Sequence, residues 1–260
     1  KNQQGLAAQA KEIGALLTRK SVLDFHHRTH RNPAVYLIDS EETNNIRNCI
    51  ELYKKYRNKP CNINVFSTLE SAETFIDAID KKDEAKAKIA AAAVALLKDN
   101  DSMGVTSGST IEAFVRQIQS KGSMKVVTPS IKLGVLLSEK MDVDLRILGG
   151  RIVPESMSTR DEYAIQGLRN VRCSKLFFSC DGFSIEDGVT SAFVEEAHLT
   201  ESMMNVAQQR ILLADSSKIG KCGFGRICGL EDVDTLITDS GISNSLVAKI
   251  EALGVEVVIA

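Results

Sequence analysis

A polar loop containing glycine, residues 106 to 110, is the first part of the sequence that could bind a small anion. The run Thr106-Ser107-Gly108-Ser109-Thr110 lies between a segment typical of a strand and one typical of a helix. Free backbone N–H groups and the helix dipole favour a phosphate at such a helix start. The run differs from G-x-x-x-x-G-K-[ST] and from G-x-G-x-x-G, so it lacks the motifs that usually indicate a nucleoside triphosphate site or a dinucleotide site. A plain capped turn is the alternative interpretation.

A glycine pair followed by arginine forms the second candidate site. Gly149 and Gly150 allow a ligand to approach the backbone closely, and Arg151 offers a guanidinium that suits phosphate. The same three residues would also form a tight turn with a solvated arginine. The sequence therefore predicts either a ligand contact or a turn here.

Two aspartate loops supply the remaining candidates, each directly after a strand-like segment. Asp181, followed by Gly182, could bind sugar hydroxyls, and Asp215 could anchor a loop in which Lys218 is a point charge for phosphate. An Asp-Gly turn and a capped turn with an exposed lysine are the alternatives. Ligands gather at the carboxyl ends of strands in open α/β sheets, so we expect all four loops at one edge.

A pair of adjacent glutamates precedes an expected helix and could suggest acid/base chemistry. Adjacent residues do not share a helix face, so at most one of Glu195 and Glu196 would point into a site. We assign Glu195 to the sugar hydroxyls together with Asp181. The four histidines receive no chemical role.

The elements that must position these loops alternate between strands and helices. In residues 1 to 80 the pattern predicts a helix over 6–25, a strand over 34–38, a helix near 46–53, a strand over 63–66 and a helix over 69–79. A domain change is expected near Asp80, with a helix crossing it. Further on, we expect strands at 103–106, 125–128, 143–148, 175–179, 210–214, 235–238 and 255–259, and helices at 109–119, 130–140, 194–208 and 243–252. This alternation implies a parallel sheet with covering helices.

The composition is that of an ordinary globular chain. Among 260 residues, 43% are hydrophobic and 25% charged, and the formal net charge is −2, so the whole chain offers no general attraction for nucleic acid or membrane. No apolar run is long enough to span a bilayer, and the start does not read as a signal peptide. Six singly spaced cysteines predict reduced, buried thiols in the cytoplasm and no metal site. We expect no cofactor.

The order of short motifs resembles the C-terminal sensor domain of DeoR-family repressors, across residues 81 to 260. The motifs are, in order, Ser107-Gly108-Ser109-Thr110, Val127-Thr128-Pro129-Ser130, Leu148-Gly149-Gly150-Arg151, Phe178-Ser179-Cys180-Asp181-Gly182, Gly188-Val189-Thr190-Ser191, Glu195-Glu196-Ala197, Leu213-Ala214-Asp215-Ser216-Ser217-Lys218-Ile219-Gly220 and Asp234-Thr235-Leu236-Ile237-Thr238-Asp239. The resemblance implies a Rossmann-like α/β fold shared with ribose-5-phosphate isomerase and glucosamine-6-phosphate deaminase. It also implies a phosphorylated sugar effector, with Thr128 at the ligand site, and self-association in a transcriptional regulator.

Sugar-phosphate isomerases of the same fold are the enzymatic alternative. They carry a second aspartate three residues after the first and a lysine just before a run of glycines, whereas Ser184 and about Asp187 hold those places here. Without them the acid/base pair for proton transfer is missing, so we expect binding without catalysis. Many family members also have a lysine after the Glu-Glu-Ala segment, where this chain has about Thr200.

Residues 1 to 80 do not match the winged helix-turn-helix that the family carries at its N-terminus. This chain has lost that module, has replaced it, or has unrelated sequence in front, and the pattern leaves the choice open. A protein-interaction or oligomerisation role for this smaller α/β segment is a further alternative. We therefore expect a homo-oligomeric sugar-phosphate sensor that reaches DNA only through a module not visible in this chain.

Overall fold

The computed structural model describes residues 34–37, 63–66, 69–119, 123–140 and 143–260. Contacts within the chain divide it into two compact units, Lys1–Lys81 and Lys82–Ala260. In the first unit, strands β1 (Ala34–Leu37) and β2 (Ile63–Phe66) pair in parallel, as expected of an α/β segment. The helices predicted within 6–25 and near 46–53 lie outside the described residues.

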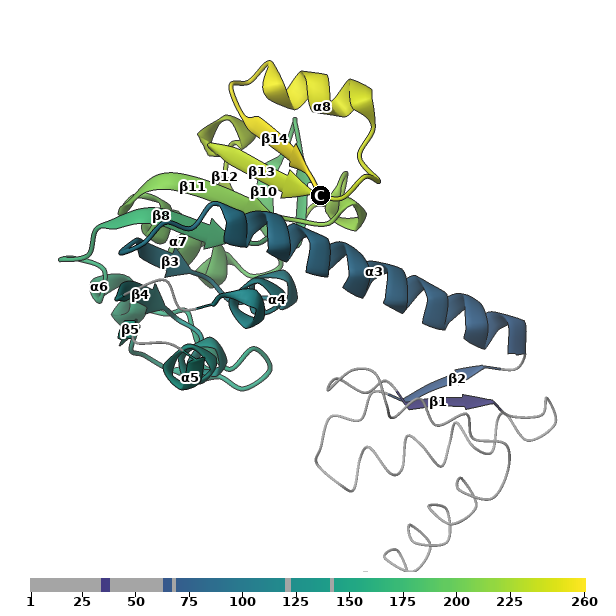
Figure 1. Cartoon of the computed structure of the whole chain (residues 1–260), viewed down its shortest axis with the longest axis horizontal. Helices are drawn as coiled ribbons and strands as arrows, with labels where there is room; N and C mark the ends of the chain where they lie inside the picture. The colour runs from purple at the N-terminus through teal and green to yellow at the C-terminus, as the bar shows by residue number, and fades with distance from the viewer. Residues whose placement is uncertain (1–33, 38–62, 67–68, 120–122, 141–142) are drawn as a thin grey trace, which may run out of the picture. The chain divides into compact units, whose positions relative to one another are not determined.

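Helix α3 (Leu69–Ala95) is one continuous helix that runs from the first unit into the second (Figure 1). The sequence has no glycine or proline between these bounds, so nothing interrupts the backbone hydrogen bonding. In the second unit, Ile89, Ala90 and Ala93 are fully buried in the core. The alanine-rich stretch is therefore the part of the helix that packs against the sheet.

The second unit is built on a seven-stranded sheet in the order β14-β13-β11-β8-β3-β4-β5, with every neighbouring pair parallel. Its strands are β3 (Ser102–Val105), β4 (Met124–Thr128), β5 (Val143–Ile147), β8 (Cys173–Phe178), β11 (Ala207–Leu213), β13 (Thr235–Thr238) and β14 (Glu256–Ile259). Each of them lies within a few residues of an expected strand. The prediction of an α/β fold with a Rossmann-like parallel sheet is confirmed.

Helices cover both faces of this sheet, and a separate hydrophobic core lies on each face. Besides α3, the covering helices are α4 (Ser109–Gln117), α5 (Ile131–Lys140), α6 (Glu162–Gln166), α7 (Val194–Met204) and α8 (Asn244–Glu251). Successive residues of a strand point to opposite faces, so Phe177 enters the core under α3, α4 and α5. Leu176 and Phe178 enter the core under α6, α7 and α8. A strand that is apolar on both faces is typical of the centre of a parallel sheet.

Several short elements were not predicted. They are the hairpin β6 (Ile152–Val153) and β7 (Ser158–Thr159), the antiparallel sheet of β9 (Gly182–Ser184), β10 (Gly188–Ser191) and β12 (Gly225–Cys228), and the 3-10 turns η1 (Ser216–Lys218) and η2 (Leu230–Asp232). Helix α6 was also missed. Segments of two to five residues are too short to show a period of either 2 or 3.6.

The helix predicted over 194–208 is wrong at its end. Helix α7 stops at Met204, and β11 begins at Ala207, which pairs with Cys173 of β8. Residues whose local pattern favoured a longer helix therefore form a strand instead, because they pair with the central strand β8. Smaller shifts of one or two residues occur at most other element ends.

The four cysteines in the described part, Cys173, Cys180, Cys222 and Cys228, are free thiols. Burial raises the pKa of Cys180 to about 12, so this thiol stays protonated and unreactive near neutral pH. Cys222 is exposed, contrary to the expectation that all would be buried. None of the described helices combines the length and the apolar character that crossing a membrane requires.

Candidate functional site

Three of the four predicted loops meet at the carboxyl edge of the sheet. The loop after β3 begins at Thr106, whose backbone N–H donates to the Phe177 carbonyl of neighbouring β8 at 3.2 Å. Asp181 follows β8, and Asp215 follows β11, which pairs with β8 on its other side. The parallel order of these strands therefore gathers the loops, as the sequence predicted.

The loop from Thr106 to Thr110 opens α4 through a glycine that no other residue could easily replace. Gly108 has φ 128°, and a Cβ there would lie 3.0 Å from the Ser179 hydroxyl oxygen. Its carbonyl accepts the first helical hydrogen bond, from the Glu112 N–H at 2.9 Å. No side chain caps this helix start in the part of the chain that the structure describes. Its leading N–H groups therefore remain available to a ligand.

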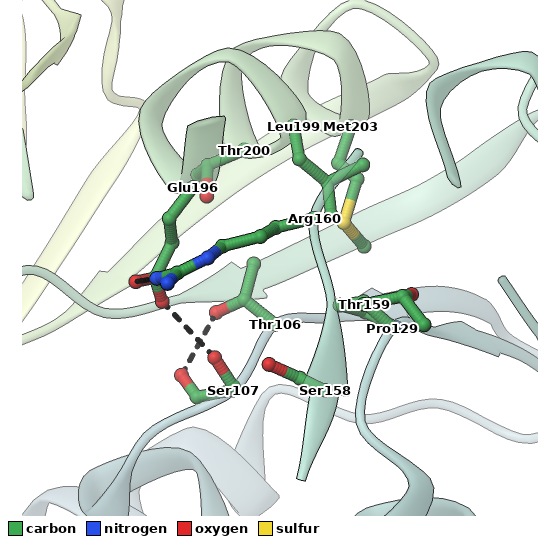
Figure 2. Close-up of a pocket in the computed structure, with 10 residues that line it drawn as sticks. All are labelled: Thr106, Ser107, Pro129, Ser158, Thr159, Arg160, Glu196, Leu199, Thr200 and Met203. Atoms are coloured by element: carbon green, nitrogen blue, oxygen red, sulfur yellow. Dashed lines mark hydrogen bonds and ion pairs between the residues drawn. The ribbon is translucent and has the colours of Figure 1, made fainter. Parts of the chain in front are cut away.

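A pocket opens beside this loop, with hydroxyl, charged and apolar groups on its walls (Figure 2). It is lined by Thr106, Ser107, Pro129, Ser158, Thr159, Arg160, Glu196, Leu199, Thr200 and Met203. Thr106 and Ser107 come from the β3–α4 loop, Ser158 and Thr159 from β7, and the last four residues from α7. Polar groups on one side and an apolar floor are the usual make-up of a small-molecule site.

Arg160 is the cation of this pocket, and no sequence motif pointed to it. Its guanidinium carbon lies 4.0 Å from the centre of the exposed Phe193 ring, a stacking contact that holds the group in place. One guanidinium nitrogen lies 3.9 Å from a Glu196 oxygen, a long ion pair. Figure 2 shows the side chain extending across the pocket toward Glu196 and Ser107. An arginine held in this manner is already oriented for an anion.

Glu196, rather than the predicted Glu195, is the glutamate that faces the pocket. It accepts a hydrogen bond from the Ser107 hydroxyl at 3.1 Å, whereas Glu195 is exposed and does not line the pocket. Glu196 shares the spacing i, i+3, i+4, i+7 with Leu199, Thr200 and Met203. This helical spacing was visible in the sequence and could have identified the glutamate that lines the pocket.

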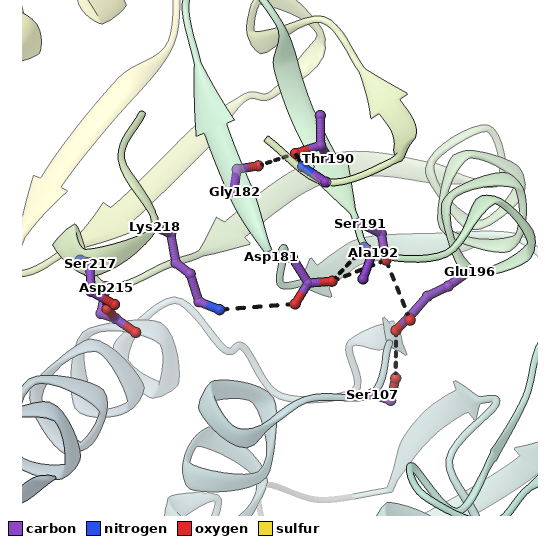
Figure 3. Close-up of polar contacts among 11 residues, drawn as sticks. Ser107, Asp181, Gly182, Thr190, Ser191, Ala192, Glu196, Asp215, Ser217 and Lys218 are labelled. Carbon is purple, nitrogen blue, oxygen red and sulfur yellow. Dashed lines mark hydrogen bonds and ion pairs between the residues drawn. The ribbon is translucent and has the colours of Figure 1, made fainter. Parts of the chain in front are cut away.

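A chain of polar contacts links this pocket to the Asp181 loop (Figure 3). The Ser191 hydroxyl lies 3.3 Å from an Asp181 oxygen and 3.4 Å from a Glu196 oxygen, and Asp181 also accepts the Ala192 N–H at 2.7 Å. A hydroxyl has one proton to donate, so Ser191 serves only one of these carboxylates at a time. The Asp181 oxygen keeps the Ala192 N–H in either case, whereas this Glu196 oxygen has no other hydrogen-bond donor among the described residues when Ser191 donates to Asp181.

Lys218 and Asp215 continue the chain on the far side of Asp181. The Lys218 ammonium lies 4.0 Å from an Asp181 oxygen, and both side chains are partly exposed. Asp215 is buried and accepts the Ser217 N–H at 3.0 Å, which caps the turn that carries Lys218. The geometry thus gives Asp215 a structural role and leaves the Lys218 ammonium accessible.

The glycine pair and its arginine are not brought to this pocket. Gly150 has φ 119°, and the space of its missing side chain is filled by Asp161. The Arg151 backbone N–H donates to Asp161 at 2.7 Å, which lowers the pKa of that carboxyl. The Arg151 side chain is exposed and does not line the pocket. The turn interpretation accounts for Gly149, Gly150 and Arg151.

Two further predicted residues have structural partners. The Thr128 hydroxyl is fully buried and accepts the Ser130 N–H at 3.1 Å. Gly182 packs against the backbone of Lys221 so closely that a side chain there would collide with it. Both therefore shape the loops next to the site rather than present groups to it. Among the described residues, no cluster of His, Cys, Asp and Glu is placed to hold a metal.

Comparison with known proteins shows what this chain is similar to. The HTH-type transcriptional regulator YulB of Bacillus subtilis is 33% identical over 172 residues, which cover 66% of each chain. The lactose phosphotransferase system repressor of Staphylococcus epidermidis is 31% identical over 60% of this chain and 62% of the relative. The match therefore spans about two thirds of the length of these relatives.

Among solved structures, ribose 5-phosphate isomerase A of Methanocaldococcus jannaschii is 17% identical, with a TM-score of 0.38 over 53% of this chain and 54% of that one. The family model described as the DeoR C terminal sensor domain matches residues 81–240. This range contains every strand and helix that lines the pocket. The chain belongs to the DeoR family and carries its C-terminal sensor domain.

Proposed function

We propose that residues 81–260 bind a phosphorylated sugar as the effector domain of a transcriptional regulator of sugar metabolism. The observation that carries this proposal is a single pocket with one guanidinium, one carboxylate and several hydroxyls at the carboxyl edge of the sheet. A cation and hydroxyl donors suit a phosphate, and a carboxylate suits sugar hydroxyls. Membership of the DeoR family and a relative named for a lactose transport system support the same ligand class.

The phosphate is held, in this proposal, between Arg160 and the start of α4. Arg160 reaches the pocket from one side, while Ser107 and the uncapped N–H groups that follow Gly108 reach it from the other. The ion pair of Arg160 with Glu196 is long, at 3.9 Å, so a phosphate oxygen at hydrogen-bond distance would be a better partner for the guanidinium. Lys218 adds a second positive charge beyond Asp181.

The sugar hydroxyls are bound by Glu196 and Asp181. Both carboxylates share the single proton of Ser191, so one of them can accept a hydrogen bond from a ligand at no cost to the protein. Glu195 would contribute only after a rearrangement of α7, because its side chain is exposed.

We further propose binding without turnover. Ser184 stands three residues after Asp181, and its hydroxyl lies 3.1 Å from an Asp187 oxygen in an exposed turn. A second carboxylate directed at the Asp181 loop is what proton transfer next to a carbonyl would need. Ligand binding instead shifts the equilibrium between two oligomer arrangements, and the DNA contact is made by a module other than this cytoplasmic sensor domain. The role of residues 1–80 in interaction or oligomerisation is part of the same proposal.

Thermal unfolding with a panel of sugar phosphates, the matching free sugars and inorganic phosphate tests the ligand class. We expect phosphorylated sugars to raise the melting temperature and free sugars to leave it unchanged, because binding to the folded state alone is stabilising. Failure of every sugar phosphate would overturn the proposal. Turnover of ribose 5-phosphate or glucosamine 6-phosphate would instead make the chain an enzyme.

Two arginine variants locate the site once a binding sugar phosphate is found. Arg160→Leu should weaken binding roughly 10- to 100-fold, the loss expected for a charge-assisted contact. Arg151→Leu is the matched control, because that side chain is exposed and outside the pocket. Titration calorimetry measures both. Equal losses in the two variants, or a loss only with Arg151→Leu, would refute the assignment of Arg160.

A further inference from the structure

Strand β5 is an open edge of the seven-stranded sheet. It pairs only with β4 among the described residues, with Val126 opposite Leu145. Val143, Leu145 and Ile147 lie on the face that α5 covers, since the Ile147 and Leu145 side chains lie against Gly134 of that helix. Open edges attract other strands, so proteins usually cover or protect them.

The backbone groups of alternate β5 residues point away from the sheet. The Leu148 N–H donates to the Thr128 carbonyl of β4 at 2.9 Å, and Ile147 is in register with Thr128. Backbone direction alternates along a strand, so the even-numbered residues face β4. The N–H and C=O groups of Val143, Leu145 and Ile147 therefore face the free edge.

We propose that β5 pairs with β5 of a second copy, antiparallel, about a two-fold axis at Leu145. This pairing places Leu145 opposite its own copy and Val143 opposite the partner's Ile147, each as a hydrogen-bonded pair. Asp144 then lies opposite the partner's Arg146 at a non-hydrogen-bonded pair, where side chains are closest. The strand Val-Asp-Leu-Arg-Ile is thus complementary to itself in charge and in shape.

The two charges also select this arrangement over the other ways of pairing. Asp144 and Arg146 are both exposed, and neither forms an ion pair within the described part of the chain. A parallel pairing in register would place aspartate opposite aspartate and arginine opposite arginine. A shift of the antiparallel register by two residues would again pair like charges, which is unfavourable across strands.

Several exposed apolar side chains also belong to β5, to the helix α5 that packs on it, or to the hairpin that follows it. Val135 of α5, Ile147 of β5 and Ile152 of β6 are 50%, 43% and 49% exposed, and Met157, 44% exposed, is joined to α5 by its carbonyl, which accepts the Ile131 N–H. A two-fold axis perpendicular to the sheet brings both copies of α5 to the same face, so the exposed Val135 and Ile147 of the two copies lie on one face of the joined sheet.

The opposite edge of the sheet lacks this self-complementarity. Strand β14 reads Glu-Val-Val-Ile, and antiparallel pairing with its own copy offers no opposite charges to fix a register. Strand β5, rather than β14, is therefore the edge that pairs with a second copy of this chain. This pairing requires no particular ligand in the pocket.

Charge reversal and charge exchange test the interface in the full chain. Arg146 is in register with the uncharged Val127, so Arg146→Asp disturbs β4 little and places like charges opposite each other twice per dimer. We expect the dissociation constant of the dimer to rise roughly 10- to 100-fold. The exchanged variant Asp144→Arg with Arg146→Asp should restore association, because opposite charges again face each other. Analytical ultracentrifugation at low salt measures both.

A proline variant tests the backbone part of the proposal independently. Ile147→Pro removes an N–H that points to the free edge and leaves the hydrogen bonds to β4 in place, so circular dichroism should remain native while association weakens. An assembly larger than a dimer should fall to half its mass in Arg146→Asp. A wild-type chain that stays at 28.4 kDa at every concentration would overturn the proposal. Association unaffected by the reversal, or not restored by the exchange, would overturn it as well.

Discussion

Strand β8 has a lysine–aspartate pair at each of its two ends, and the two pairs differ in almost every physical respect. At its amino end, the Lys175 ammonium lies 2.6 Å from Asp101, and both side chains are buried. At its carboxyl end, the Lys218 ammonium lies 4.0 Å from Asp181, and both side chains are partly exposed. The same two residue types therefore form a closed contact at one edge of the sheet and a loose one at the other.

The difference extends to the groups around each pair. Asp101 also accepts hydrogen bonds from the Lys98 N–H at 2.8 Å and the Ser174 hydroxyl at 3.0 Å. Around Asp181 and Glu196, one Ser191 hydroxyl is shared between two carboxylates. A fully bonded cluster holds β3 and β8 together, whereas a cluster short of donors can exchange its contacts for those of a ligand. On the proposed function, the amino edge of the sheet thus serves stability and the carboxyl edge serves ligand binding.

Of the two lysines, the buried Lys175 should cause the larger loss of stability when it is replaced. Lys175→Met leaves the Asp101 carboxylate buried without its cation, which should lower the free energy of unfolding by about 3–5 kcal/mol. Urea denaturation measures the change. Lys125→Met is the matched control, because Lys125 is exposed on β4 in the same sheet and should matter little. Equal losses in both variants would contradict a special role for the buried pair.

The pH dependence of stability gives a second, smaller test of the same cluster. Burial tends to raise the pKa of Asp101, but the hydrogen bonds from Lys175, Lys98 and Ser174 outweigh it, and the pKa lies below its ordinary value of 3.8. A lowered pKa means that the carboxylate stabilises the fold above about pH 3.8 and that this stabilisation is lost as the pH falls through the folded-state pKa. The gap in unfolding free energy between wild type and Asp101→Asn should therefore narrow in acid.

A gap that stays constant from neutral pH to below the ordinary pKa of the carboxyl would show that Asp101 is not held ionised by its neighbours. Asp161 and Asp239 also have lowered pKa values, since backbone N–H groups donate to them. The wild-type protein should then lose some stability in acid through several carboxyls, and only the difference between the two chains isolates Asp101.

The sequence predicted those parts of the candidate site whose position follows from the order of strands in the sheet. Ser107, Asp181 and Lys218 follow the ends of strands that pair in parallel, so their gathering could be inferred from the alternating pattern. The position of Arg160 could not be inferred in this way. Arg160 reaches the pocket through the hairpin of β6 and β7, and two-residue strands leave no periodic signal in the sequence.

Gly150, the glycine before Arg151, shows that a motif visible in the sequence can still allow two structural interpretations. In the sequence, a glycine pair is compatible with a ligand contact and with a tight turn, and the position of Asp161 beside Gly150 in the structure favours the turn. Likewise, the choice between Glu195 and Glu196 required the helical spacing of α7, which the sequence did contain. The overall α/β fold and the sheet edge beside the candidate site were therefore predictable, while the side chains contributed by short elements were not.

The smallest effect on stability should come from the same substitution at the other end of β8. Lys218→Met removes a partly exposed ion pair at 4.0 Å, which should change the free energy of unfolding by less than about 1 kcal/mol, because solvent screens such pairs. Its effect should appear instead in calorimetric titration with a sugar phosphate, where the loss of a positive charge weakens binding. Lys175→Met, studied at a temperature where it remains folded, should bind normally. If Lys218→Met destabilised the fold as much as Lys175→Met, the loose pair would be a structural clamp, and the division between a stabilising edge and a binding edge would fail.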